Sequence, residues 1–139
     1  MPVTSTSPTA TDLFRAWFDN SPFTQQLDLR IERLTPDGAE LLMPFDSSRT
    51  THSDVVHGGA IATLIDVAAT AAAWSTTELP QTPRGATVDM SLQYLSAGRG
   101  DLRAHARVLR RGSLCPSEVE VVDGAGKLVA KALVTYKIG

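Results

Sequence analysis

Hydrophobic residues near the N-terminus recur at the spacing of a helix. The four positions are Leu13, Phe14, Trp17 and Phe18, all within DLFRAWFDN. Thr11 or Asp12 can cap this segment, and Ser21-Pro22 ends it. The pattern therefore predicts a short N-terminal helix that packs on an apolar surface.

The hydrophobic period shortens to two residues from Leu27 onward. Leu27, Leu29 and Ile31 alternate with polar side chains, which is typical of a half-buried strand. The turn TPDG at 35–38 then leads into AELLMPF, so the pattern predicts a hairpin. A polar loop, DSSRTTHSD, follows the hairpin.

The longest apolar segment is VVHGGAIATLIDVAATAAAW, from Val55 to Trp74. It predicts one long helix that is apolar almost all round and must be enclosed on most of its surface. A carboxylate, Asp66, lies in its middle, and the pair Gly58-Gly59 lies near its start. A buried acid needs a partner that this helix does not supply, unless the acid has a chemical task.

Only strands are expected after this helix. The segments TVDMSLQYL, DLRAHARVL, PSEVEVVD and KLVAKALVTYKI are joined by short turns, so the four strands should be largely antiparallel. In the first of them, the alternation points Val88, Met90, Leu92 and Tyr94 to one face. The whole pattern predicts an α+β fold with a short N-terminal helix and a single antiparallel sheet wrapped around a long central helix.

Composition and charge exclude several classes of protein. A net charge of −2 and a pI near 5.9 give no field that gathers nucleic acid or anionic lipid. The apolar stretch 60–74 contains Asp66 and is shorter than the about 20 residues of a membrane span. Residues 1–11 lack the pattern of a secretory signal, so we expect a flexible tail there, one domain over 12–139 and a cytoplasmic location. Cys115, the one cysteine, is expected to be a buried and inert thiol.

The motifs, taken in order, resemble a known family. VHGGAIATLID, the strand TVDMSLQYLSAG, the turn LRRG and the final GKLVAKALVTYKI are similar in order and spacing to the hotdog-fold acyl-CoA thioesterases of the phenylacetate-operon (PaaI-like) type, in the 4-hydroxybenzoyl-CoA thioesterase superfamily. The resemblance extends from about Ser21 to Ile138. It implies a homodimer, often paired into a homotetramer, that hydrolyses acyl-CoA thioesters without a metal or a bound cofactor.

The glycine pair suits the stabilisation of a thioester oxygen. Glycines at a helix start leave backbone N–H groups uncovered, with the positive end of the helix dipole behind them. Negative charge developing on a carbonyl oxygen would be stabilised there, as in an oxyanion hole. The candidate donor is Gly58 or Gly59. Gly58 matches the family's donor position, and Gly59 is expected to contact substrate beside it. His57 either donates a hydrogen bond to the same carbonyl or fixes the loop.

Asp66 is the candidate nucleophile or general base. It lies eight residues after Gly58, about 12 Å along the helix axis, so one thioester carbon cannot contact both groups of the same helix. The resemblance implies that two helices run antiparallel across a dimer, which brings Gly58 of one subunit to Asp66 of the other. The alternative is a buried acid held by backbone groups or by an arginine.

The resemblance adds two candidate polar residues to the catalytic set. Thr87 falls where the family carries a Ser or Thr that orients the attacking water or the carboxylate. Thr51 falls where many relatives have Asn or Gln, and it is a departure from the pattern. Either Thr51 performs a weaker version of that task or the adjacent His52 replaces it.

Coenzyme A carries phosphates, which guanidinium groups bind well. Arg110, Arg111 and Gly112 form a turn between strands, and Arg110 matches a basic position of the family, although a solvated basic turn is the alternative. Tyr94 is a further candidate for substrate contact. Arg84, Arg99 and Arg103 are further candidate phosphate ligands of equal rank, and His105 is expected to be a surface or interface residue.

Two acyl classes, small aromatic and medium-chain, are compatible with the sequence. Candidate residues of the acyl tunnel between subunits are Phe23, Phe45, Leu64, Ala68 and Trp74. Two other functions stay open: a hotdog hydratase or dehydratase, and a non-catalytic acyl-CoA-binding module. The hydratase would need an acid-base motif of its own, in which His57 and Asp66 do not sit.

Overall fold

A computed structural model describes residues 7–139 of the chain. Its helices are α1 (Ala10–Asp19), α2 (Pro22–Gln26) and α3 (Gly58–Trp74). The main sheet has six antiparallel strands, in the spatial order β1 (Arg30–Thr35), β2 (Gly38–Met43), β6 (Leu102–Val108), β7 (Leu114–Val122), β8 (Leu128–Ile138) and β5 (Gly85–Tyr94). A one-turn helix, η1 (Ser47–Arg49), precedes a small hairpin of β3 (Thr50–His52) and β4 (Val55–Val56).

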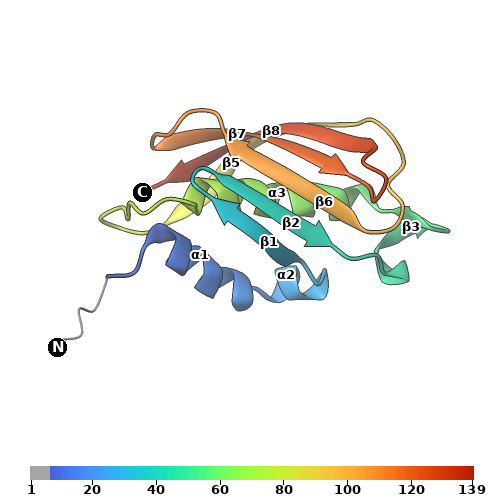
Figure 1. Cartoon of the computed structure of the whole chain (residues 1–139), viewed down its shortest axis with the longest axis horizontal. Coiled ribbons are helices and arrows are strands. Elements are labelled where there is room, and N and C mark those ends of the chain that lie inside the picture. Colours follow the sequence, from blue (N-terminus) through green and yellow to red (C-terminus); the bar gives the residue numbers. More distant parts are fainter. Residues whose placement is uncertain (1–6) are drawn as a thin grey trace.

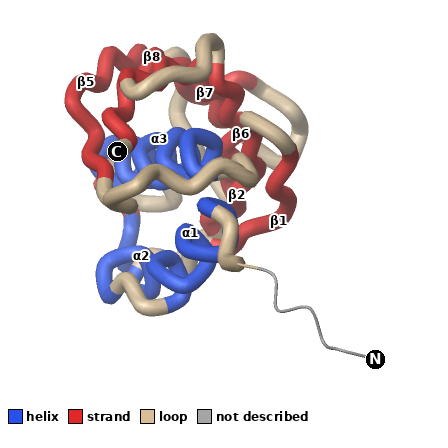
Figure 2. The backbone as a smooth tube through the Cα atoms, turned by 90° about the vertical axis from the view of Figure 1, so that its left-hand side faces the viewer, coloured by secondary structure: helices blue, strands red, loops and turns tan. Residues whose placement is uncertain are grey.

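The six-stranded sheet curls over α3, as the hydrophobic pattern predicted (Figures 1 and 2). Helix α3 contacts β2, β6, β7 and β8, and its alanines let the sheet approach closely. Ala68, Ala69 and Ala72 have no exposed surface. The central helix is therefore packed into the concave face of the sheet, while α1 and α2 lie outside it (Figure 2).

The N-terminal helix exists but begins earlier than predicted. Thr9, and not Thr11 or Asp12, caps α1, and Thr9 and Asp12 form a reciprocal capping box. The predicted flexible tail over 1–11 therefore overlaps α1, while residues 1–6 lie outside the described part of the chain. Phe14 is buried against α3 and the sheet, which satisfies the predicted apolar face.

A short helix that was not predicted follows α1, and the first strand begins three residues later than the Leu27 start that was predicted. Pro22 begins α2, because its fixed φ suits the first position of a helix. Leu27 caps that helix and Asp28 has φ of 49°, so the first strand begins only at Arg30. Leu27 and Leu29 are buried as expected. They are buried at the end of α2 and in the turn after it, and not in a strand.

The long helix begins at Gly58, three residues later than predicted, and ends at Trp74 as predicted. Val55 and Val56 form β4, which pairs with β3 inside the segment that was expected to be a polar loop. The hydrophobicity of Val56 reflects burial in this hairpin, because its side chain is 5% exposed. His57 has extended backbone angles and caps the helix.

The first strand after α3 contains a β-bulge that the alternation did not reveal. Pairing with β8 slips between Thr87 and Asp89, so Val88 is the extra residue and its side chain is 54% exposed. Val88 therefore leaves the face that it was predicted to share with Met90, Leu92 and Tyr94. Tyr94 is exposed, but its hydroxyl still reaches the start of α3. Met90 and Leu92 pack against the core as predicted.

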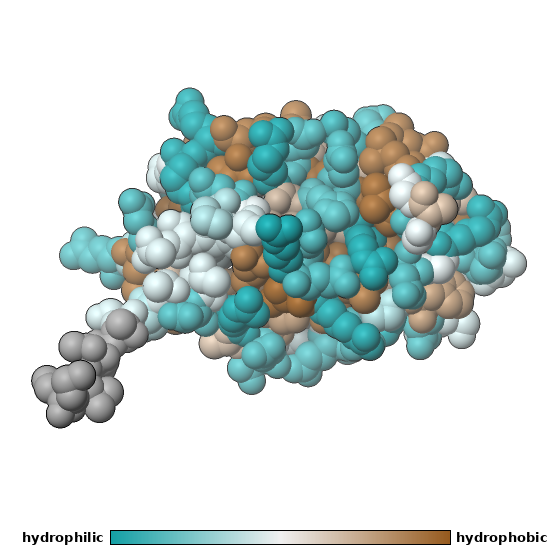
Figure 3. All heavy atoms as spheres, in the orientation of Figure 1, coloured by the Kyte–Doolittle hydropathy of each residue, from teal (hydrophilic) through white to brown (hydrophobic). Residues whose placement is uncertain are grey.

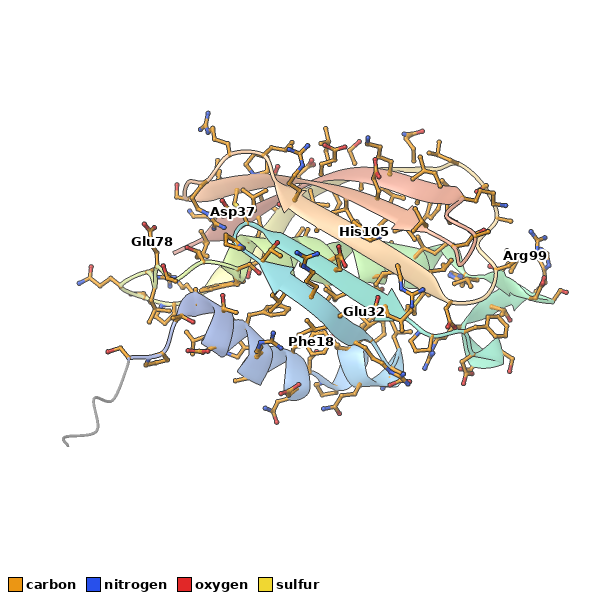
Figure 4. All side chains as sticks on the ribbon, in the orientation of Figure 1. Phe18, Glu32, Asp37, Glu78, Arg99 and His105 are labelled. Carbon is orange, nitrogen blue, oxygen red and sulfur yellow. The ribbon has the colours of Figure 1, made fainter. Side chains whose placement is uncertain are left out.

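The convex face of the sheet carries a network of charged side chains. Arg103 pairs with Glu32, and His105 lies 3.4 Å from Glu40. Figure 3 shows hydrophilic groups interspersed with hydrophobic ones on this side, and Figure 4 shows Glu32 and His105 over β1 and β6. The expectation that His105 is a surface residue is confirmed.

Two further expectations concern burial. Cys115 has no exposed surface, and burial raises the pKa of its thiol, as expected for an inert cysteine. Within residues 7–139, no helix has the length and hydropathy needed to cross a bilayer.

Candidate active site

The carboxylate in the middle of α3 has a specific partner. The hydroxyl of Thr87 donates a 2.6 Å hydrogen bond to Oδ1 of Asp66. Both residues are half-buried, and no arginine or lysine pairs with Asp66 within the described residues. The alternative of a buried acid neutralised by an arginine is therefore not what this structure contains. One carboxylate oxygen is held in place and Oδ2 keeps its acceptor capacity.

The bulge at Val88 explains why Thr87 reaches the helix. Along a regular strand, Thr87 would share the face of Asp89, Ser91 and Gln93 and point away from α3. The extra residue shifts the alternation by one, so Thr87 turns inward opposite Tyr136. A local irregularity of β5 thus creates the Asp66–Thr87 pair.

The start of α3 is organised by its cap. The Nδ1 atom of His57 accepts a 2.8 Å hydrogen bond from the Gly59 amide. Because Nδ1 is the acceptor, the neutral ring carries its proton on Nε2 and can donate there. The loop-fixing role considered for His57 is present in the structure, and it leaves a donor on the exposed side of the ring.

Only one of the two glycine amides is free to act as an oxyanion donor. The Gly59 amide is bound to His57, whereas the Gly58 amide has no hydrogen-bond partner among residues 7–139. Its carbonyl accepts a 2.7 Å hydrogen bond from the hydroxyl of Tyr94. This arrangement favours Gly58 over Gly59 as the donor to a substrate oxygen.

The two halves of the candidate site do not meet within one chain. Gly58 begins α3 and Asp66 lies eight residues later, about 12 Å along the axis. Partly exposed residues of α3 recur every three or four positions and form an open stripe: Ala62, Thr63, Asp66, Val67 and Thr70. Asp66 therefore lies on a strip of α3 that the chain's own sheet does not fully cover.

Thr51 and His52 lie at the same end of α3 as Gly58. Both are exposed in β3, and Thr51 is the residue skipped where the pairing of β3 with β4 slips. The hairpin is tied to the helix start because the His57 amide donates to the carbonyl of Arg49. No described hydrogen bond joins either side chain to Gly58, so their roles stay predictions.

Comparisons with known proteins identify the family of the chain. The family described as a domain of unknown function (DUF4442) matches residues 10–138. The medium/long-chain acyl-CoA thioesterase YigI of Salmonella typhimurium is 31% identical over 134 residues, which cover 85% of this chain and 86% of that protein. A Halobacterium salinarum protein whose assigned name proposes an esterase is 34% identical over 120 residues, 84% of this chain and 80% of that protein.

Solved structures give the same answer for the fold. A thioesterase family protein of Silicibacter pomeroyi superposes with a TM-score of 0.83 at 25% identity, over 93% of this chain and 97% of that one. The chain belongs to the hotdog acyl-CoA thioesterase family. The PaaI protein of Escherichia coli, from the phenylacetic acid degradation operon, shares the hotdog fold at 21% identity, with a TM-score of 0.80 over 94% of this chain and 93% of that one.

Arg111 has a structural role in this hotdog chain that its motif did not reveal. Its guanidinium donates to the carbonyls of Ala72 and Ala73 in the last turn of α3, and it also pairs with Asp37 in the β1–β2 turn. The carbonyls of the last turn carry the negative end of the helix dipole, and that of Ala72 also accepts a hydrogen bond from the Ser75 amide. Arg111 therefore fastens the end of α3 to the turn between β1 and β2, where Figure 4 labels Asp37.

Three other basic residues of the hotdog domain gather at the same end. Arg110 is exposed in the β6–β7 turn, and that turn is joined to β8 by the bond from the Ile138 amide to the Ser113 carbonyl. Arg84 and Lys137 line a hollow of about 300 Å³ beside it. None of the three, Arg84, Arg110 or Lys137, has a carboxylate partner within residues 7–139. Sequence reasoning missed Lys137, which looks like an ordinary polar strand residue.

The other arginine candidates are already paired. Arg99 contacts Asp54 at 3.2 Å and Arg103 contacts Glu32 at 2.8 Å. Both pairs are exposed, so each is weak and could open, but neither residue lies at the turn that contains Arg110. The structure therefore ranks Arg84 above Arg99 and Arg103.

Three of the suggested acyl-tunnel residues are placed elsewhere. Leu64, Ala68 and Trp74 have no exposed surface, because they pack in the chain's own core. Trp74 also donates a 2.9 Å hydrogen bond to the Tyr136 hydroxyl. Their assignment to a tunnel wall is wrong, whereas Phe23 and Phe45 are exposed and stay candidates.

Proposed function

We propose that this chain hydrolyses acyl-CoA thioesters to the free acid and CoA, with Asp66 of one subunit and the Gly58 amide of its partner at each site. The observation that carries the proposal is the Thr87–Asp66 hydrogen bond on the uncovered stripe of α3. It supplies an oriented carboxylate. The helix start supplies the Gly58 amide, which has no partner in the described part of the chain and has the helix dipole behind it.

A homodimer is needed to complete this site. Strand β5 ends the sheet and, among the strands of residues 7–139, pairs only with β8, so its ten residues have an open edge on the other side. Long open edges are prone to pair with another chain, and Val88 and Tyr94 on this edge are more than half exposed. Pairing two copies along β5 would bring the open stripes of two α3 helices together. Antiparallel stripes would then place Gly58 of one copy near Asp66 of the other.

The chemistry follows from these positions. The thioester carbonyl oxygen accepts from the Gly58 amide, with the Nε2–H group of His57 as a second donor. Asp66 either removes a proton from a water that attacks the carbonyl carbon, or attacks that carbon itself to form a mixed anhydride. In both routes the thiolate of CoA leaves and is protonated, and in the second a water then hydrolyses the anhydride to release the acid and restore Asp66. In a single turnover in ¹⁸O-labelled water, label found in the Asp66 carboxylate would show the second route, because a water that Asp66 only deprotonates never leaves its oxygen on Asp66.

The basic end of the chain suits the phosphates of coenzyme A. Arg110, Arg84 and Lys137 lie at the end of α3, and Trp74 is eight residues after Asp66, about 12 Å along the axis. The extended pantetheine arm can bridge such a gap. For the acyl group we propose medium-chain substrates ahead of aromatic ones, since the named relative acts on medium and long chains.

Thiol release from a panel of acyl-CoAs tests the proposal. We expect wild-type protein to release CoA and Asp66→Asn to lower turnover by at least about 100-fold, the scale of a lost acid-base group. Asp19→Asn is the matched control, since Asp19 is an exposed acid at the end of α1. If wild-type protein releases no CoA from aromatic, short, medium or long substrates, the proposal is wrong. Hydration of an enoyl-CoA instead would indicate a hydratase.

A further inference from the structure

One peptide group at the start of α3 is hydrogen-bonded at both ends by aromatic rings. Its carbonyl belongs to Gly58 and accepts from the Tyr94 hydroxyl at 2.7 Å. Its N–H belongs to Gly59 and donates to Nδ1 of His57 at 2.8 Å. Tyr94, the Gly58–Gly59 peptide and His57 therefore form a continuous chain of hydrogen bonds from the end of β5 to the helix cap.

The two rings also leave little room around this peptide. A Cβ atom added at Gly58 would lie 3.3 Å from the ring and hydroxyl oxygen of Tyr94. A Cβ atom added at Gly59 would lie 3.0 Å from Nδ1 of His57. The glycine pair thus allows both rings to close on the backbone, in addition to uncovering the Gly58 amide.

The direction of these two hydrogen bonds favours one position of the proton on the neutral His57 ring. A hydroxyl that donates to a carbonyl withdraws electron density from the conjugated peptide and makes its N–H a stronger donor. The stronger donor on Nδ1 favours the ring form that carries hydrogen on Nε2. Loss of the Tyr94 hydroxyl would weaken that preference without touching His57.

We propose that Tyr94 is a positioning residue, not a substrate ligand, and that it holds His57 in the Nε2–H form through the Gly58–Gly59 peptide. The proposal rests on the proposed thioesterase function for its kinetic consequence only. Its structural consequence, the proton position on His57, can be measured without substrate.

The first test is spectroscopic. Long-range ¹H–¹⁵N correlation spectra of His57 in the whole protein should show the Nε2–H form, and Tyr94→Phe should move the ring nitrogens toward a mixture of both neutral forms. Thr63→Val is the matched control, because it also removes a hydroxyl-to-carbonyl bond, but to the carbonyl of Gly59 in the next peptide. An unchanged His57 spectrum in Tyr94→Phe overturns the proposal even if the enzyme is active.

The second test separates positioning from substrate contact. With an acyl-CoA that the wild type hydrolyses, Tyr94→Phe should lower kcat about 2- to 10-fold, the scale of one neutral hydrogen bond, with KM unchanged. In a His57→Ala background, Tyr94→Phe should have no further effect, because the path to His57 is gone. A raised KM with unchanged kcat would show that Tyr94 contacts substrate and would contradict the proposal. If wild-type protein hydrolyses nothing, the proposed function fails while the spectra still decide the role of Tyr94.

Discussion

Thr87 and Asp66 are 21 positions apart in the chain and are joined by a 2.6 Å hydrogen bond between β5 and α3. The bond exists because a bulge at Val88 turns Thr87 toward the helix. This hydrogen bond fixes the direction of the Asp66 carboxylate. If Asp66 acts as proposed, its activity should therefore depend on the Thr87 hydroxyl.

Removing that hydroxyl should impair the carboxylate without removing it. We expect Thr87→Val, which keeps the side-chain shape, to lower kcat about 10- to 100-fold, the equivalent of a hydrogen bond to a charged group. Thr87→Ser retains the hydroxyl and should keep most of the activity. Steady-state thiol release measures both variants. Equal activity of Thr87→Val and wild type would mean that the bond has no catalytic importance.

The Gly58 amide can be deleted with little damage to the helix. Gly58 is the first residue of α3, where proline is well tolerated, and His57 already has φ of −61° and ψ of 134°, which suit a residue before proline. We expect Gly58→Pro to lower turnover about 100-fold or more, as for loss of an oxyanion donor. Gly58→Ala retains the amide and controls for the added Cβ. If both variants lose activity equally and retain their circular dichroism, the amide is not the donor.

Of the two neighbouring arginines, Arg111 should contribute to the stability of the fold and Arg110 to the binding of acyl-CoA. Arg111→Ala removes the cap on the end of α3 and its bonds to Asp37, so the free energy of unfolding should fall by about 1–3 kcal/mol. Arg110→Ala should change it by no more than about 0.5 kcal/mol, because Arg110 is exposed. Arg110→Ala should instead raise KM for acyl-CoA. Urea unfolding and KM, each measured on both variants, check these two roles. A lower free energy of unfolding in Arg110→Ala than in Arg111→Ala would contradict them.

The pH dependence of Tyr136 reports the charge on Asp66. Burial raises the pKa of the Tyr136 hydroxyl, the bond from Trp74 lowers it, and the negative charge of Asp66 raises it further. The unfolded value is near 10, so the stability contributed by this group is complete below about pH 10 and is lost as pH rises through the higher folded pKa.

Two variants check this reading by tyrosinate absorbance against pH. Asp66→Asn should lower the titration midpoint of Tyr136 toward its ordinary value, and Trp74→Phe should raise it. Tyr136→Phe identifies which of the two tyrosines is observed. A midpoint that does not respond to Asp66→Asn would show that no charge at Asp66 acts on this ring.

The sequence predicted the features that depend on local periodicity. The long helix, the four strands after it and the buried Cys115 follow from apolar spacing and from turns such as DGAG at 123–126. The exact start of α3 did not, because Val55 and Val56 are equally hydrophobic in a helix and in a buried hairpin.

Contacts between distant segments could not be predicted from periodicity. Thr87 was proposed from family resemblance alone, since a period of two places it on the outer face and only the bulge reverses it. The sequence predicts a phosphate ligand at Arg111 and does not predict its contacts with the carbonyls of Ala72 and Ala73. Those contacts depend on how the sheet curls around α3. Both cases involve side chains whose partners are set by tertiary structure.

Mixing two inactive proteins tests the central claim that each site takes Asp66 from one subunit and Gly58 from the other. Asp66→Asn and Gly58→Pro are each expected to be inactive alone. Unfolded together in equal amounts and refolded, they should form mixed dimers in which one of two sites has both groups intact. Half of the dimers are mixed, so thiol release should recover to about a quarter of the wild-type rate per subunit. No recovery in mixed dimers verified by differential tags would show that both groups act within one chain, and would contradict the account.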